Sequence, residues 1–488
     1  MNHKSQLVKN TVIIAIGKLS TQILSYILLP LFTAKMSVGE YGTYDFVCTI
    51  SMFLCPIITL LMEEAMFRFL IDASTKKEMK NIISQTVLYT LAGIFVFIPL
   101  ASIILKFSTN YSPFFITIFI TFVISNIVIA LSNALARGLS KIKLYSFSNF
   151  ILGIGTLILT IIVLVFFPSA GGLLLANAIA NILTAIVIFA KLHLKSFMGK
   201  YDKPLMKQMI KYSFPLVPNS ISWSIINMSD RIILTKMINS DANGIYAMAN
   251  KFPNIINVLY GYFYTAWKES AAKIIKDENR KEYYNMIYQD MKRFIYAVTI
   301  CLIAIMPFVF PIFINKNYDE AFIYIPIIMI ATYYSNLSSF YGGIFSAYKD
   351  TKIMGTTTFV AAAINLVIDL IFVYKFEIYA ACFSTLLADL IVYFYRKKKI
   401  EKYIKLKEVK WVGPTIILAF VCICYYLRYI QNIPNILYWI LNIISLIVAI
   451  SYSIAINYNI VSKILLKLKA KFVKWKDLTY EVFWNRWN

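Results

Sequence analysis

The most constraining feature of the sequence is a series of hydrophobic runs, each about 20 residues long, that recurs along its whole length. A helix of that length crosses the ~30 Å hydrocarbon core of a bilayer. Hydrophobic residues make up 59% of the chain and charged residues 15%, whereas a soluble domain has about 25% charged residues. These values exclude a soluble protein and a disordered one. We predict an all-α membrane protein with about 14 transmembrane helices, at residues 10–33, 41–62, 83–105, 114–136, 146–168, 171–192, 212–237, 245–267, 294–314, 321–345, 354–374, 378–395, 412–429 and 436–458.

The basic residues are distributed unequally between alternate loops. Of the 48 Lys and Arg residues, 39 fall in the two termini and one set of loops, six in the opposite loops and three inside predicted spans. Short loops that are rich in Lys and Arg stay in the cytoplasm. We therefore expect both termini to be cytoplasmic. The net charge of +24 then serves membrane topology, and we expect no nucleic-acid partner.

Residues that usually carry catalysis or bind metals are scarce. The six cysteines form no Cys-x-x-Cys pair, and the two histidines, His3 and His193, lie outside the hydrophobic runs. A disulfide framework, a metal site and a cofactor are therefore not indicated. The predicted external loops are too short to carry the catalytic groups of a membrane polymerase, ligase or glycosyltransferase. We expect the protein not to be an enzyme.

An internal repeat relates the two halves of the chain. A shift of 202 residues aligns Gly42 with Gly244 and Tyr44 with Tyr246 after the first and seventh spans. Because six spans separate the copies, both would enter the membrane from the same side and form parallel repeats. We predict two six-helix lobes at residues 1–200 and 201–400, and two further transmembrane helices at 401–461. Residues 462–488 have the pattern of a basic amphipathic helix on the cytoplasmic leaflet.

Polar side chains share one face of the first, seventh and eighth predicted spans. A charged side chain costs at least ~2.5 kcal/mol in the middle of a bilayer, so these faces should not contact lipid. We expect them to line a cleft between the lobes and to contact the substrate through Lys18, Gln22, Ser25, Asn227, Asp230, Arg231, Asn250 and Lys251.

Structural roles compete with this interpretation of the polar residues. Arg231 could instead pair with Asp230 or with an acid on another helix, and Lys251 could extend its side chain to the membrane surface. Asp369 and Asp389, in the eleventh and twelfth spans, could bind a proton or a cation, or could form interhelical hydrogen bonds.

The cytoplasmic end of the second predicted span also carries charged residues. Glu63, Glu64 and Arg68 follow its last hydrophobic residues. We interpret them as a solvated cap on the span.

Three segments resemble a known family. They are KNTVIIAIGKLSTQILSYILLPLFTAKMSVGEYGTYDF (9–46), SDRIILTKMINSDANGIYAMANKFPNI (229–255) and AAAINLVIDLIFVYKFEIYAACFSTLLADL (361–390). They are similar to bacterial polysaccharide repeat-unit flippases (Wzx-like) of the multidrug/oligosaccharidyl-lipid/polysaccharide exporter superfamily. The sequence departs from that family at residues 377–381, where Glu-Ile-Tyr-Ala-Ala replaces Gly-x-x-Gly-Ala.

The resemblance implies a function. An undecaprenyl-diphosphate-linked oligosaccharide, the repeat unit of an O-antigen, capsule or exopolysaccharide, would move from the inner to the outer leaflet of the bacterial cytoplasmic membrane by alternating access. Membrane lipids, a polysaccharide polymerase and a chain-length regulator are the implied partners. Two alternatives stay open. A peptidoglycan lipid-precursor flippase would share these features, whereas a small-molecule exporter of the same superfamily should have a more acidic cleft.

Overall fold

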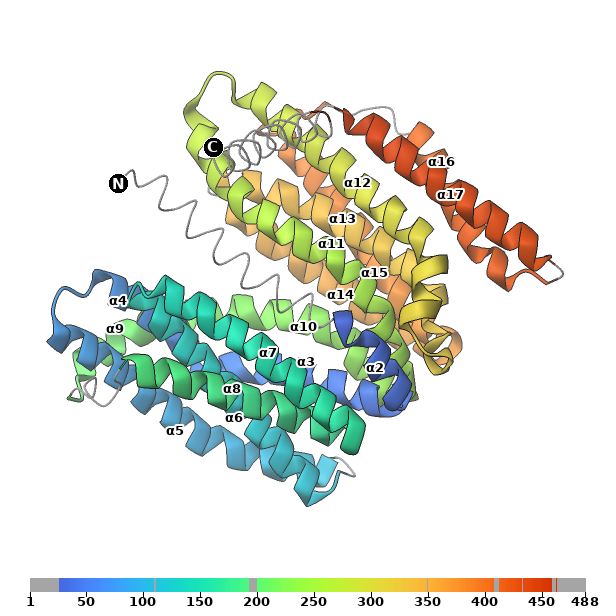
Figure 1. The fold of residues 1–488 in the computed structure, drawn as a ribbon. Coiled ribbons are helices and arrows are strands. Elements are labelled where there is room, and N and C mark those ends of the chain that lie inside the picture. Colours follow the sequence, from blue (N-terminus) through green and yellow to red (C-terminus); the bar gives the residue numbers. More distant parts are fainter. Residues whose placement is uncertain are drawn as a thin grey trace, which may run out of the picture. The chain divides into compact units, whose positions relative to one another are not determined.

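The computed structural model describes residues 26–108, 111–192, 200–348, 350–407, 412–431, 433–458 and 462. These residues form α-helices joined by short turns, and strands are absent from this part of the chain (Figure 1). The helices are α2 (Leu29–Lys35), α3 (Val38–Thr59), α4 (Met62–Asp72), α5 (Lys76–Ser108), α6 (Pro113–Gly138), α7 (Ile142–Phe166), α8 (Ala170–Leu192), α9 (Lys203–Ser213), α10 (Val217–Ile233), α11 (Ser240–Lys273), α12 (Arg280–Phe313), α13 (Ala321–Ala347), α14 (Thr351–Phe376), α15 (Ile378–Ile400), α16 (Val412–Tyr426) and α17 (Asn435–Ile456).

Polar side chains begin several of these helices. The hydroxyls of Ser37 and Ser112 accept hydrogen bonds from the backbone N–H groups of the first turns of α3 and α6, at 3.3 and 3.2 Å. Asp202 does the same for α9, at 3.0 Å. Such caps satisfy N–H groups that have no partner inside the helix, and so they set where each helix starts.

Eleven of the described helices are long and apolar enough to cross a membrane, so the predicted multi-pass membrane protein is confirmed, while the count of 14 is not. The missing three are the first, seventh and eighth predicted spans. The first lies mostly outside the described residues. The seventh covers the end of α9, the 3₁₀ turn η2 (Phe214–Leu216), α10 and most of the π-helical turn η3 (Leu234–Ile238), and the eighth is the polar helix α11. These are also the spans for which the sequence predicted polar faces.

The chain forms two compact units. Unit 1 comprises residues 1–249, 311–324 and 358–384, and unit 2 comprises residues 250–310, 325–357 and 385–488. Unit 1 therefore combines segments from both predicted lobes, at residues 1–200 and 201–400.

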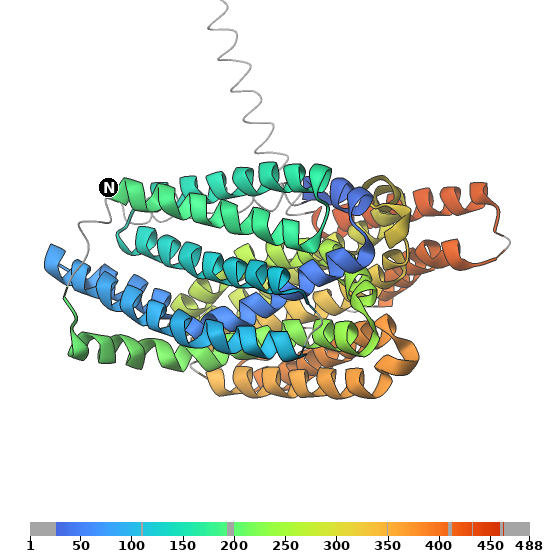
Figure 2. The ribbon, with the colours of Figure 1, turned by 90° about the horizontal axis from the view of Figure 1, so that it is seen from below.

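Helices α6, α7 and α8 lie side by side in unit 1, as both ribbon views show (Figure 2). Val47 of α3 packs with Phe119 of α6 and Leu174 of α8 in one buried cluster. A second cluster joins α4, α5, α6, α8 and α9 around Met62 and Ile188, both 0% exposed. These clusters hold α4 and α3, of which α3 carries residues of the candidate site, against the rest of unit 1.

Aromatic side chains dominate the interior of unit 2. Trp267 of α11 stacks on Phe340 of α13 with ring centroids 4.3 Å apart and donates a hydrogen bond to the Phe340 carbonyl at 3.1 Å. Arg396 of α15 is 6% exposed and binds the Thr357 hydroxyl at 2.9 Å and the Ser338 carbonyl at 3.2 Å. Its hydrogen bonds tie three helices together, which is a structural role.

Candidate functional site

The second helices of the two repeat copies, α3 and α11, cross at a pair of glycines in unit 1. A Cβ atom on Gly42 of α3 would lie 1.9 Å from the carbonyl oxygen of Ser240, and one on Gly244 of α11 would lie 2.2 Å from that of Val38. Because Ser240 and Gly244 are the counterparts of Val38 and Gly42 in the 202-residue shift, the contact is reciprocal. The two backbones approach as closely as they do because glycine has no side chain.

Hydrogen bonds reinforce the crossing from several segments. Asn243, which is 0% exposed, donates to the Gly42 carbonyl at 2.7 Å. Tyr318 donates to the Ser37 carbonyl at 3.1 Å, and the Thr33 hydroxyl accepts from the Asn315 N–H at 3.1 Å. Segments more than 200 residues apart in the sequence are thus closed against each other at the turns that we predict to be external.

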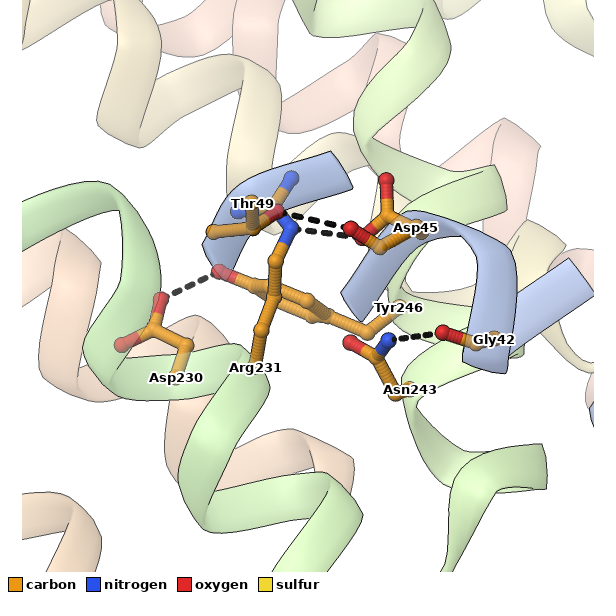
Figure 3. Close-up of polar contacts among 7 residues, drawn as sticks. All are labelled: Gly42, Asp45, Thr49, Asp230, Arg231, Asn243 and Tyr246. Carbon is orange, nitrogen blue, oxygen red and sulfur yellow. Dashed lines mark hydrogen bonds and ion pairs between the residues drawn. The ribbon is translucent and has the colours of Figure 1, made fainter. Parts of the chain in front are cut away.

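An ion pair joins α10 to α3 beside this crossing (Figure 3). Arg231 Nε lies 2.6 Å from Asp45 Oδ2, and the two side chains are 20% and 19% exposed. The guanidinium also lies 5.9 Å from the ring centroid of Tyr246, within cation–π range. Of the structural alternatives for Arg231, pairing with an acid on another helix is the one observed.

Asp230, the neighbour of Arg231, points to a different set of residues. It is 5% exposed and accepts a 2.5 Å hydrogen bond from the Tyr246 hydroxyl (Figure 3). The carboxyl of Asp369 on α14, which is 0% exposed, interacts directly with it. Two buried carboxyls in contact are both ionised only beside a compensating positive charge, and the Arg231 guanidinium interacts electrostatically with Asp230.

Neutral oxygen and amide groups surround the Asp230–Asp369 pair. The Ser229 hydroxyl donates to Asn365 Oδ1 at 3.0 Å, and Asn365 Nδ2 donates to the Ser384 hydroxyl at 3.0 Å. Oxygen ligands of this kind suit a hard cation. The described residues contain no group of three or more His, Cys, Asp or Glu side chains with metal-site geometry.

The segment after Arg231 departs from α-helical geometry. Residues Leu234–Ile238 form a π-helical turn between α10 and α11. Short π-helical turns are frequently found at functional sites. The turn places an adaptable backbone directly next to the two charged residues of α10.

The structure places the residues predicted from the sequence as follows. Lys18, Gln22, Ser25, the side chain of Asn227 and the tail after Ser462 lie outside the described residues. Asp230, Arg231 and Asp369 are brought together in unit 1, whereas Asn250, Lys251 and Asp389 belong to unit 2. The cationic cleft as a whole therefore stays a prediction.

Four residues of the site were missed from the sequence: Asp45, Tyr246, Asn365 and Ser384. The position of Asp45 inside a predicted span could have identified it, because an acid in a membrane-spanning helix requires a partner. Tyr246 was noted only as a match in the repeat. Asn365 stands four residues before Asp369, on the same face of a helix, which is the signal that could have identified it.

Comparisons with known proteins agree with this architecture. Residues 7–267 match the model of a family described as "Polysaccharide biosynthesis protein". Similar solved structures are "Lipid II flippase MurJ, inward closed conformation" (15% identity, TM-score 0.71, 92% of this chain and 100% of the other) and an inward-facing multidrug resistance MATE family transporter of the MOP superfamily (12%, 0.61, 80% and 98%). A MOP superfamily transporter from Pyrococcus furiosus is also similar (10%, 0.54, 80% and 96%). At these identities the similarity establishes the fold alone. No curated protein sequence matches the chain.

Proposed function

Because the chain belongs to the polysaccharide biosynthesis protein family, we propose that it flips undecaprenyl-diphosphate-linked oligosaccharide repeat units across the bacterial cytoplasmic membrane. The repeat unit of an O-antigen, capsule or exopolysaccharide would move from the inner to the outer leaflet. Both termini would be cytoplasmic, and a polysaccharide polymerase and a chain-length regulator would act with it. The observation that carries a transport mechanism is the reciprocal crossing of α3 and α11, where two repeat copies close one end of the predicted path.

The proposed substrate contacts follow from the charge of a diphosphate. Lys18 and Lys251 supply cations, and Gln22, Ser25, Asn227 and Asn250 supply neutral hydrogen-bonding groups for the sugars. Charge-assisted hydrogen bonds to phosphate are about twice as strong as neutral ones. Such an anionic head would explain why lysines are kept inside predicted spans.

Arg231 has two roles in this proposal. With the crossing closed, it binds Asp45 at 2.6 Å. A diphosphate that reaches the cleft competes with the Asp45 carboxylate for the same guanidinium. Transfer of Arg231 from Asp45 to the substrate removes a contact that holds α10 against α3, so substrate binding favours opening of the crossing.

Ion coupling is assigned to the buried carboxyls. Asp230 and Asp369 bind the coupling proton or alkali cation, supported by Asn365 and Ser384. Asp389 of unit 2 is a weaker candidate, because the buried guanidinium of Arg396 lies within electrostatic range of it.

The experiment that tests the function is deletion of the gene, followed by analysis of the lipid-linked oligosaccharides that accumulate in the membrane. We expect an undecaprenyl-diphosphate repeat unit to accumulate in the inner leaflet and its surface polymer to be lost. A peptidoglycan precursor accumulating instead would establish the alternative lipid-precursor flippase, whose diphosphate head presents the same chemistry. Unchanged lipid-linked saccharides with altered sensitivity to small toxic compounds would favour the small-molecule exporter.

A further inference from the structure

The helix of the second predicted span is broken at its end by two leucines whose backbone conformation is unusual for that residue type. Between α3 and α4, Leu60 and Leu61 have φ values of 46° and 54°, in the left-handed region that favours glycine. Leucine adopts this conformation only where its surroundings enforce it, and such outliers cluster at functional sites. The Thr59 hydroxyl accepts the Leu61 N–H at 3.1 Å, and a Cβ on Gly93 of α5 would lie 2.2 Å from the Ile58 carbonyl oxygen. Tight packing thus holds the break in place.

A carboxyl group is buried directly after this break. Glu63 Oε2 is inaccessible to solvent and has no hydrogen-bond partner among the described residues. Its neighbours Met62 and Ala65 are 0% exposed and belong to the hydrophobic cluster around α4. Glu63 as a whole is half-buried, so the interpretation of a solvated cap does not extend to this carboxyl oxygen. The same interpretation fits Glu64 and Arg68, whose side chains are 45% and 46% exposed.

The charged and titratable groups around Glu63 do not compensate an ionised carboxylate. Glu64 follows it on α4 and Cys55 faces it from α3. Arg137 of α6 lies 3.5 Å from Glu64 and 4.7 Å from the ring centroid of Phe67, so its charge is already engaged.

The remaining two helices packed against α4 also carry titratable tyrosines. Tyr89 of α5 packs against the cluster that contains Met62, and the Tyr212 ring of α9 lies 6.1 Å from the Phe69 ring of α4. Helix α5 presents Gly93, and the Ser213 hydroxyl at the end of α9 contacts the Met62 sulfur at 3.7 Å. Burial raises the pKa of Glu63 above its usual range. Hydrogen bonds from its own N–H and from Thr59 partly oppose this, and the Glu64 carboxylate adds the smallest effect, which raises the pKa.

We propose that Glu63 is a proton-binding site, protonated from the cytoplasmic water in the conformation described here and deprotonated when the break at Leu60–Leu61 rearranges. The site is separate from the Asp230–Asp369 pair, and its part in a transport cycle rests on the proposed function. The direction of the pH dependence follows from the linkage between proton binding and conformation. A carboxyl whose pKa is higher in this conformation than in the rearranged one favours this conformation at low pH, and favours the rearranged one as the pH rises through the raised value.

Infrared difference spectroscopy of the purified full-length protein in liposomes tests the protonation directly. A pH titration of the wild type should show the band of a protonated buried carboxyl that disappears above the usual range of a glutamate. Because the Asp230–Asp369 pair is a second candidate for a protonated carboxyl, the comparison is made in an Asp369→Asn background. There Glu63→Gln should remove this band, and the matched control Glu64→Gln should retain it. A band that persists in Glu63→Gln would overturn the proposal. If Glu63→Gln does not fold, Glu63→Asp should shift the midpoint of the titration, and an unchanged midpoint would overturn it equally.

A transport measurement separates this proposal from the proposed function. We expect Glu63→Gln to be stable in the membrane and to lose the pH dependence of flipping, with at least a several-fold lower rate at alkaline internal pH. Glu64→Gln should behave as the wild type. If the wild type flips no lipid-linked oligosaccharide but the infrared band is lost in Glu63→Gln, the substrate assignment fails and the proton site stands.

Discussion

At the residue scale, the central interaction is the ion pair between Arg231 and Asp45. Arg231→Ala leaves a mostly buried carboxylate without its counter-charge. We expect it to lower the free energy of unfolding by about 2 kcal/mol, somewhat less than the roughly 3–5 kcal/mol of a fully buried pair. Thermal unfolding of the purified protein in detergent measures this loss.

The double variant Arg231→Ala, Asp45→Ala supplies the control, because it removes both charges. Its stability should recover most of the loss. Complementation then distinguishes the two roles of Arg231. If Arg231 also binds the substrate, the double variant stays inactive at normal membrane abundance, whereas full activity would assign Arg231 a structural role alone.

The Asp230–Asp369 pair leads to a second prediction at this scale. Asp369→Asn removes one of two interacting carboxyls and with it the need for a compensating proton or cation. We expect flipping in proteoliposomes to lose its dependence on an imposed proton or sodium gradient. Tyr246→Phe, which removes the hydrogen bond to Asp230 but leaves both carboxyls, should keep that dependence at a reduced rate. Unchanged gradient dependence in Asp369→Asn would remove the pair from the coupling mechanism.

At the scale of elements, the crossing of α3 and α11 depends on the absence of a side chain. Gly42→Ala would place a Cβ 1.9 Å from a backbone oxygen, so the two helices must separate. Overpacking of this kind costs about 1–3 kcal/mol, and we expect a correspondingly lower melting temperature and weaker flipping. Gly355→Ala on α14 is the matched control, because its added Cβ meets no atom within 4 Å. Equal melting temperatures for the two variants would contradict the close crossing.

The elements also show what the sequence could predict. The hydrophobic runs located the helices, because a span must bury about 20 apolar residues in lipid. The 202-residue repeat paired Gly42 with Gly244, and these two glycines do meet. The break at Leu60–Leu61 was not predictable, since neither residue favours a left-handed conformation and packing against neighbouring helices enforces it.

Contacts between residues far apart in the chain could not be predicted from the sequence either. Arg231 and Asp45 are separated by 186 positions, and periodicity within a helix carries no information on such a distance. The sequence shows which residues are charged, and only the fold shows which of them pair. The same holds for Asp369, for which the sequence named no partner and which interacts with Asp230.

At the scale of the whole molecule, the distribution of Lys and Arg predicts the topology. Reporter fusions after Gly39, Gly172 and Asn317 should report an external location, and fusions after Lys200 and Lys399 an internal one, because basic loops stay in the cytoplasm. Truncation after Ser462 should preserve insertion and most transport. An internal location at Gly172 would contradict the alternation of the loops, and loss of the truncated protein from the membrane would assign the tail a structural role.

The central claim is that the crossing of α3 and α11 must open for the substrate to reach the outer leaflet. A Cβ on Gly39 would lie 3.9 Å from Ser240 Cβ, which is within the Cβ–Cβ separation of a disulfide. The direct test is flipping by the Gly39→Cys, Ser240→Cys variant, made in a background without the six native cysteines, before and after oxidation. Oxidation should arrest flipping and a reductant should restore it, while each single variant stays active. Continued flipping with the disulfide fully formed would contradict the account.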